Sequence, residues 1–277
     1  MEQGEAGRLV GRAQAAWEAG EWLRAAELYE RVLAHYPDEE PSASWWYDAA
    51  LAYKFLRNWE KAYELGREAA ARAPRGAGDP AYWDLGIAAT VRREWAVARD
   101  AWRGFGVRLP DGEGRIDAEF GTACVRLDTD GVRETVRVRR LCPTRGRVVS
   151  VPVTSGRRFG EVVVHDGVPS GERSLGGRTF AVFDELALFE PSGLPTLHVA
   201  VDAPATADIA ALVRAFTGRD FGARPDGSRL RLAAPEPEAR ALLDAWSAAH
   251  PGRSWSDLGP GAHTDADTGE VADTGAA

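Results

Sequence analysis

The sequence has 277 residues, an apolar content of 44% and a formal net charge of -8 at pH 7. This length exceeds the typical domain of about 100–150 residues, so we expect two or three domains and a sizeable buried core. The acidic balance does not favour nucleic acid as a partner. No stretch approaches the run of about 18 apolar residues that a membrane span needs, so we expect a cytoplasmic protein.

One helical pattern occurs three times between about residues 7 and 110, centred on Ala25, Ala62 and Ala98. A tryptophan stands three residues before each alanine: Trp22, Trp59 and Trp95. A proline stands twelve residues after each alanine: Pro37, Pro74 and Pro110. A small residue stands twelve residues before each alanine: Ala13, Ala50 and Gly86. Small residues let two crossing helices approach to roughly 8–10 Å. Proline ends the second helix of a pair because its ring cannot continue one.

The pattern predicts three helical hairpins. The expected helices are Gly7–Trp17 and Glu21–Tyr36, Pro41–Leu56 and Trp59–Ala73, and Pro80–Val91 and Trp95–Leu109. Eight of the ten tryptophans and all six tyrosines precede Phe105, so the larger core is expected here.

These features resemble the tetratricopeptide repeat (TPR), whose pattern is W-x2-L-G-x2-Y, then A-x3-F, then P. The residues that fit are Trp46, Ala50, Tyr53, Ala62 and Pro74 in the second repeat, and Tyr82, Leu85, Gly86, Ala98, Trp102 and Pro110 in the third. The first repeat is weaker but keeps Ala13, Gly20, Ala25, Tyr29 and Pro37. The chain as a whole looks like uncharacterised bacterial TPR proteins with a β-rich carboxyl-terminal half.

The resemblance implies a groove for a protein or peptide partner, lined by the first helix of each hairpin. Carried over by position, the groove residues are Gln14, Trp17, Tyr47, Leu51, Lys54, Phe55, Trp83 and Ile87. Only Gln14 and Lys54 approach the side chains of TPRs that grip a terminal carboxylate, so such a clamp is not expected. An exposed apolar groove of this size is costly. We expect it to be covered by a partner helix or peptide or by the chain's own carboxyl-terminal half, and the sequence does not decide between them.

Residues 113–194 predict a small antiparallel barrel or sandwich. Short valine-rich segments separated by Gly, Pro and Asp are typical of strands; the expected strands are Ala123–Leu127, Glu134–Leu141, Arg147–Pro152, Gly160–His165 and Thr179–Leu186. Cys124 and Cys142 form no C-x2-C pair, which argues against a zinc site or disulfide framework. We expect neither a metal nor a cofactor.

The same region is rich in arginine. Arg137 and Arg139 alternate with valines along one expected strand, so they share a face away from the core. Together with Arg145 and Arg147 they make a possible face for an anionic partner, such as RNA or an acidic protein. The 12 acidic residues of 113–195 balance its 12 basic ones, so nucleic-acid binding stays an alternative hypothesis.

Residues 195–256 predict a small α/β unit. The expected order is a strand at Thr196–Val201, a helix at Thr206–Thr217, a hairpin from Asp220–Ala223 to Leu230–Leu232 and a helix at Pro235–Ala249. This β-α-β-β-α order makes up most of a ferredoxin-like fold. The acidic residues 257–277 are expected to form a disordered tail.

The leading hypothesis is therefore a non-catalytic scaffold, with 1–112 as the repeat domain. A toxin-neutralising or regulatory binding partner is a second hypothesis of the same kind. The adjacent His165 and Asp166 are the only residues that suggest an enzyme. A turn-stabilising pair is the simpler interpretation, because no other possible metal ligand or catalytic base has suitable spacing.

Overall fold

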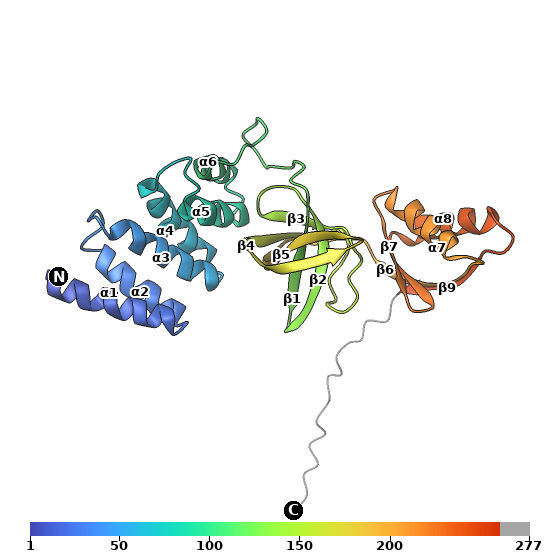
Figure 1. Ribbon diagram of the computed structural model, residues 1–277, viewed down its shortest axis with the longest axis horizontal. Helices are drawn as coiled ribbons and strands as arrows, with labels where there is room; N and C mark the ends of the chain where they lie inside the picture. Colours follow the sequence, from blue (N-terminus) through green and yellow to red (C-terminus); the bar gives the residue numbers. More distant parts are fainter. Residues whose placement is uncertain (261–277) are drawn as a thin grey trace, which may run out of the picture. The chain divides into compact units, whose positions relative to one another are not determined.

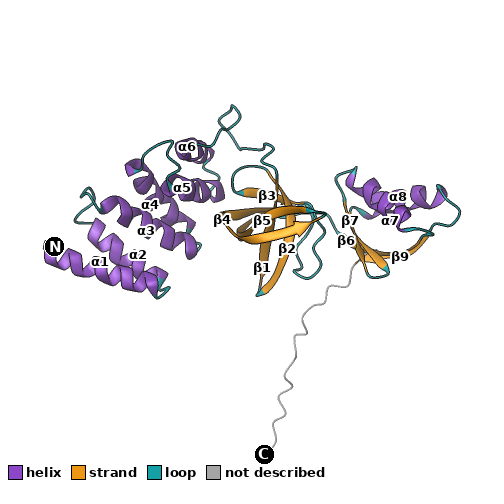
Figure 2. Ribbon diagram, viewed as in Figure 1, coloured by secondary structure: helices purple, strands orange, loops and turns teal. Residues whose placement is uncertain are grey.

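The computed structural model describes residues 1–260, with helices in the first part of the chain and strands in most of the rest (Figures 1 and 2). This order, helices before two antiparallel sheets, confirms the coarse prediction. The chain forms two compact units. The first comprises Met1–Val125, Val138–Arg147 and Val162–Glu190; the second comprises Arg126–Arg137, Val148–Glu161 and the part from Pro191. These units do not follow the expected boundaries at 112 and 194.

Six helices open the first unit, and each packs on the next along the chain. They are α1 (Gln3–Glu18), α2 (Trp22–Leu33), α3 (Ser42–Phe55), α4 (Trp59–Arg72), α5 (Pro80–Val91) and α6 (Trp95–Phe105). Their bounds lie within a few residues of the predicted ranges. The end of α6 comes four residues early because Gly106 takes a left-handed conformation with φ 111°.

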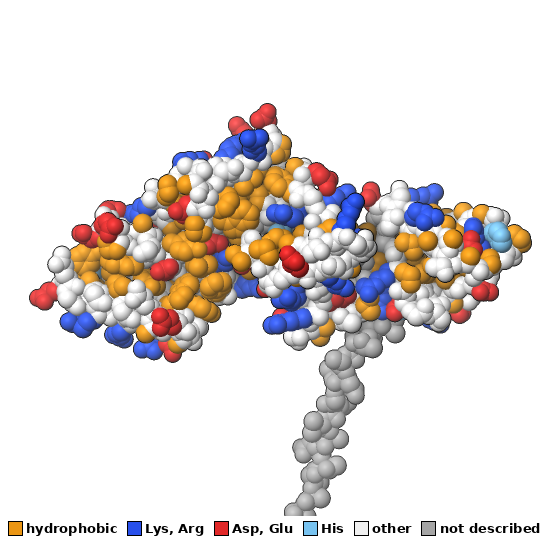
Figure 3. Space-filling model, viewed as in Figure 1, with side chains coloured by type: hydrophobic (Ala, Val, Ile, Leu, Met, Phe, Trp, Pro, Cys, Tyr) orange, Lys and Arg blue, Asp and Glu red, His pale blue; other side chains and the backbone are white. Residues whose placement is uncertain are grey.

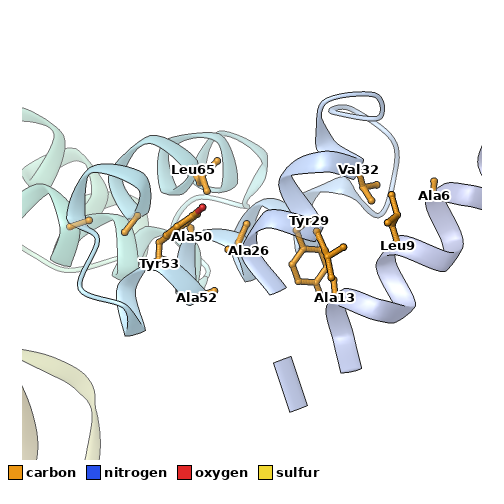
Figure 4. Packing of buried hydrophobic residues seen from close by; sticks show 14 residues of the cluster. Ala6, Leu9, Ala13, Ala26, Tyr29, Val32, Ala50, Ala52, Tyr53 and Leu65 are labelled. Carbon is orange, nitrogen blue, oxygen red and sulfur yellow. The ribbon is translucent and has the colours of Figure 1, made fainter. Parts of the chain in front are cut away.

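Small residues lie where the helices cross. Ala13, Ala25 and Ala98 are completely buried, and Figure 4 shows the packing of Ala13 and its neighbours in the first hairpins. A Cβ atom on Gly86 would lie 2.6 Å from the Trp102 ring. The third crossing therefore needs glycine, because Trp102 is itself fully buried.

The first helix of each hairpin ends in the same way. Gly20, Arg57 and Arg93 have left-handed φ values of 73°, 58° and 64°, and each lies five residues before the alanine of its crossing. The amide after each of them, on Glu21, Asn58 or Glu94, donates to a carbonyl five residues back at 2.9 Å. This is the Schellman arrangement, and its recurrence at one register is a structural repeat.

A closed five-stranded barrel follows, with the strands in sequential order. It contains β1 (Thr122–Thr129), β2 (Val132–Arg140), β3 (Arg145–Val148), β4 (Val162–Leu175) and β5 (Arg178–Glu190). The last two strands are longer than predicted because they continue as an exposed hairpin through Gly176-Gly177. Both glycines have positive φ, as a tight hairpin turn requires.

Within the first unit, strand residues cover the end of the helical stack. Ile87 and Trp102 share a buried cluster with Ile116, Val164 and Phe189. Two of the left-handed turn residues reach β5: Arg57 Nη2 donates to the Glu185 carbonyl at 2.9 Å, and Arg93 Nη2 donates to the Phe189 carbonyl at 3.3 Å. The repeats and these strands therefore share one core.

The second unit contains a four-stranded sheet in the order β7-β8-β6-β9, with antiparallel neighbours. Its elements are β6 (Thr196–Asp202), α7 (Thr206–Thr217), β7 (Gly222–Asp226), β8 (Arg229–Ala233), α8 (Glu236–Ala248) and β9 (Ser254–Pro260). The two helices pack on the sheet through one buried cluster, in which Val199 of β6 lies with Phe216 of α7 and Leu243 of α8.

Strand β9 corrects the predicted start of the tail. Residues 257–260 belong to β9, whose last two residues pair with Leu197 and His198 of β6. Trp255 and Leu258 pack against the core of this unit. The short polar sequence around Asp257 concealed the strand, because few of its residues favour β structure. The rest of the predicted tail, 261–277, lies outside the described residues.

Candidate functional site

A cleft of about 500 Å³ lies in the first unit, where α3 and α5 face the middle of β4. Five of the predicted groove residues line it: Tyr47, Leu51, Lys54, Phe55 and Trp83. The sequence places them there because Tyr47, Leu51 and Lys54 recur at helical spacing and so share one face of α3. Trp83 comes from the corresponding face of α5.

Three charged side chains meet at the floor of the cleft. Lys54 Nζ lies 2.8 Å from Asp84 Oδ1 and 3.2 Å from Asp166 Oδ1. The Lys54 side chain is 5% exposed, while those of Asp84 and Asp166 are 12% and 21% exposed. Tyr47 and Asp84 also line the cleft beside Lys54. The floor is thus a buried ion-pair network that joins α3, α5 and β4.

The environment shifts the pKa of Lys54, Asp84 and Tyr47. Burial lowers the pKa of Lys54, but Asp84 and Asp166 outweigh it and the net pKa is raised. Burial raises the pKa of Asp84, and the charge of Asp166 raises it further, against the opposing effect of Lys54. Burial and Asp84 together raise the pKa of the Tyr47 hydroxyl. Lys54 therefore stays protonated and serves as the counter-ion for both carboxylates.

The chain's own residues Asp166, Gly167 and Val168 form one wall of the cleft. Gly167 packs directly on the Trp83 indole nitrogen, so closely that no side chain fits there. Its amide donates to Asp166 Oδ1 at 2.7 Å, which fixes the carboxylate toward Lys54. Val168 is 72% exposed at the rim.

Aromatic rings make up much of the remaining surface. The Trp83 ring packs at 5.0 Å from Trp102 and 4.8 Å from Phe105, which also lines the cleft. Phe55 is 42% exposed and packs at 4.9 Å from Trp22. On the face shown in Figure 3, hydrophobic side chains are exposed over the helical part of the chain.

The other predicted groove residues lie elsewhere. Gln14 lines a separate cleft between α1 and the loop before α3, and Trp17 packs on Trp22 and Phe55. Ile87 is completely buried in the cluster that joins the helices to the strands, so its prediction as a partner-binding residue is wrong. The physical reason is that the barrel covers this end of the repeats.

The side chains of His165 and Asp166 do not bond to each other. The His165 ring is buried, its Nδ1 lies 2.7 Å from the Asp166 backbone carbonyl, and it stacks on Phe183 with ring centroids 4.8 Å apart. Burial lowers the pKa of His165 to about 4. The Asp166 carboxylate instead bonds to Lys54. The two adjacent side chains therefore have different partners: His165 packs on Phe183, and Asp166 pairs with Lys54.

The predicted arginine face is only partly present. Arg137 and Arg139 are exposed and alternate with buried Val136 and Val138, and Arg147 is half-buried. Arg145 is completely buried and lies over the rings of Trp95 and Phe189 at 5.2 and 5.1 Å. Its assignment to an exposed anion-binding face is therefore wrong, because its guanidinium is enclosed between these rings and pairs with Asp117.

The sequence did not identify six residues of the cleft: Pro80, Asp84, Phe105, Asp166, Gly167 and Val168. Asp84 follows Trp83 on the groove helix and was available from the repeat register alone. Asp166 and Val168 carry no such signal, because their positions depend on the packing of β4 against α3 and α5.

Within residues 1–260, no helix is long and apolar enough to cross a membrane, and no group of His, Cys, Asp or Glu is arranged to hold a metal ion. The chain matches no protein-family model and no curated protein. A solved structure described as a hypothetical protein from Neisseria gonorrhoeae is similar at 14% identity over 49% of this chain and 91% of that one. Its TM-score of 0.23 is too low to support an inference about fold or function.

Proposed function

We propose that this protein is a non-catalytic adaptor of the TPR type, which holds a protein partner in the cleft between α3, α5 and β4. One observation carries the proposal: five residues that the repeat register assigns to a partner groove line a single open cleft. Its apolar and aromatic lining suits side chains of a peptide or helix.

The repeat assignment is supported by the register of the helices. The buried small residues at the crossings and the left-handed helix ends at Gly20, Arg57 and Arg93 recur at matching positions. We further propose that the second unit is a complete ferredoxin-like fold, since β9 adds the sixth element to its β-α-β-β-α series.

In this proposal the groove is covered partly by the chain's own carboxyl-terminal half and partly by the partner. Gly167 and Asp166 cover the inner part, at Trp83 and Lys54. The outer part, with Phe55 and Val168, is left for the partner. Both residues are substantially exposed, as residues at the edge of a docking site are.

Affinity capture with matched variants tests the proposal. Val168→Asn places a polar amide at the rim of the cleft, and Leu188→Asn places the same amide on β5, where Leu188 is 48% exposed and outside the cleft. The partner is identified from a lysate of the source cell with the wild-type chain, and its affinity for each purified variant is then measured by calorimetry.

We expect Val168→Asn to weaken binding of the partner by roughly tenfold and Leu188→Asn to leave it unchanged, because burying an unpaired amide at an apolar contact is costly. Equal affinities of the two variants would place the binding surface elsewhere on the chain.

A further inference from the structure

The cleft contains one more carboxylate than it has cations to balance it. Asp84 and Asp166 both lie within bonding distance of Lys54, at 2.8 and 3.2 Å. Among the residues that the structure describes, no other charged side chain lines the cleft. When both carboxylates are ionised, one unit of negative charge is left in a largely apolar site, where opposite charge is attracted more strongly than in water.

Lys54 is not available to an anionic ligand. Its ammonium bonds to both carboxylates, its side chain is almost completely buried, and it lies 5.6 Å from the Phe55 ring centroid. Removing it from Asp84 and Asp166 would leave two carboxylates without their counter-ion. The cleft is thus closed to the terminal carboxylate of a peptide by its existing ion pairs.

Asp166 retains an unused acceptor. Both hydrogen bonds to its carboxylate, from Lys54 Nζ and from the Gly167 amide, go to Oδ1. Within residues 1–260, no hydrogen bond is made to Oδ2. The Asp166 side chain is 21% exposed and lines the cleft.

The walls around this acceptor also favour a cation. Tyr47, Phe55, Trp83 and Phe105 line the cleft, and the faces of aromatic rings attract positively charged groups. A guanidinium is planar, stacks on aromatic rings and bonds to a carboxylate through a fixed pair of donors, which an ammonium does not do. The volume of about 500 Å³ accommodates such a side chain with part of its backbone.

We propose that the cleft recognises an arginine side chain of the protein partner, with Asp166 as its counter-ion and the aromatic residues as its walls. This inference rests on the proposed function, since it names the chemical group that the adaptor site selects. It excludes recognition of a terminal carboxylate, in agreement with the expectation from the sequence.

The test uses capped single amino acids as probes of the full-length protein. Nα-acetylarginine N-methylamide is compared with its citrulline analogue, which has nearly the same shape but no charge, and with the norleucine analogue, which is apolar. Binding is followed by the indole NMR signal of Trp83, assigned by its loss in Trp83→Phe. Asp166→Asn removes the excess charge, and Glu172→Gln, at an exposed site on the same strand outside the cleft, is the matched control.

We expect arginine to bind roughly tenfold more tightly than citrulline. Asp166→Asn should abolish that preference, whereas Glu172→Gln should retain it. An affinity for citrulline or norleucine equal to that for arginine would overturn the inference while leaving the cleft as a partner site. If no probe shifts the Trp83 signal, both the inference and the proposed adaptor site fail. Retention of the preference by Asp166→Asn would also overturn the inference, because the counter-ion would not be Asp166.

Discussion

Lys54 and Lys61 are the only lysines of the chain, and their environments are opposite. The Lys54 side chain is 5% exposed and bonds to two carboxylates, whereas that of Lys61 is 39% exposed and pairs with Glu30 at 2.7 Å. The chain therefore contains one buried lysine ion-pair network, at Lys54, and one exposed lysine ion pair, at Lys61, with which it can be compared. The energetic consequences of the two should differ, because a buried charge that loses its partner cannot be hydrated.

We expect Lys54→Met to lower the free energy of unfolding by about 3–5 kcal/mol, since Asp84 would remain buried without its counter-ion. Lys61→Met should change it by less than about 1 kcal/mol. Urea denaturation of both variants measures the difference. The double variant Lys54→Met, Asp84→Leu should recover part of the loss; equal stability of the single and double variants would mean that Asp84 is not the group left uncompensated.

His165 gives a prediction about pH. Burial lowers its pKa to about 4 in the folded state, whereas an unfolded histidine has a pKa of about 6.5. Between these values only the unfolded chain binds the proton, so the stability contribution is present above about pH 6.5 and is lost as the pH falls toward 4. The loss amounts to roughly 3 kcal/mol.

His165→Phe should remove this pH dependence while keeping a ring against Phe183. The free energy of unfolding of wild type, relative to that of the variant, should therefore fall by roughly 3 kcal/mol from pH 7 to pH 4. Denaturant titrations at several pH values measure it, with His35→Gln on the exposed surface as the control. A difference that stays constant with pH would show that His165 titrates normally.

At the scale of elements, the third helix crossing depends on Gly86. A Cβ atom there would lie 2.6 Å from Trp102, which is enclosed on all sides. We expect Gly86→Leu to cost about 1–3 kcal/mol or more through overpacking. Thermal unfolding followed by circular dichroism measures the loss.

Gly11 is the matched control for this substitution. It lies on the exposed side of α1 with no atom near the position of a Cβ. Gly11→Ala should stabilise the protein by up to about 1 kcal/mol, because alanine is the better helix former. If both glycine variants melt like wild type, the helix crossing does not have the described register.

The helical elements were predictable because their signals are local. Proline, tryptophan and alanine recur at fixed spacing, and helix spacing alone places Tyr47, Leu51 and Lys54 on one face. The hairpin of β4 and β5 was underestimated because Pro169 and Gly171 interrupt the strand pattern, although both residues are paired with β5. Strand β9 was missed because its pairing with β6 is distant in sequence.

The residues of the candidate site also divide into those with a local sequence signal and those without one. Its helical residues follow from the repeat register, but Asp166 and Val168 enter through tertiary packing that no local pattern specifies. Two residues were misassigned. Ile87 was placed in the groove from the repeat register and Arg145 was grouped with the arginines near it in sequence, yet the junction of helices and strands buries both.

At the scale of the molecule, the repeats should not fold independently of the strands. Trp102 and Ile87 share their buried cluster with Leu141, Val162 and Phe189, all of which lie beyond residue 112. A fragment of residues 1–112 would expose this apolar surface to water. We expect it to melt at a lower temperature than the full chain and to self-associate, as measured by circular dichroism and size-exclusion chromatography. A monomeric fragment with an unchanged melting temperature would contradict this shared core.

The two arginines at the helix ends have a mechanical consequence. In a free array each repeat contacts only its neighbours, so those contacts alone set the spacing of the repeats. Here the turns at Arg57 and Arg93 are fastened to two carbonyls of the same strand, β5. These two bonds hold the ends of α3 and α5 at fixed positions along β5. For the proposed adaptor, little ordering entropy would then remain to be lost when a partner binds.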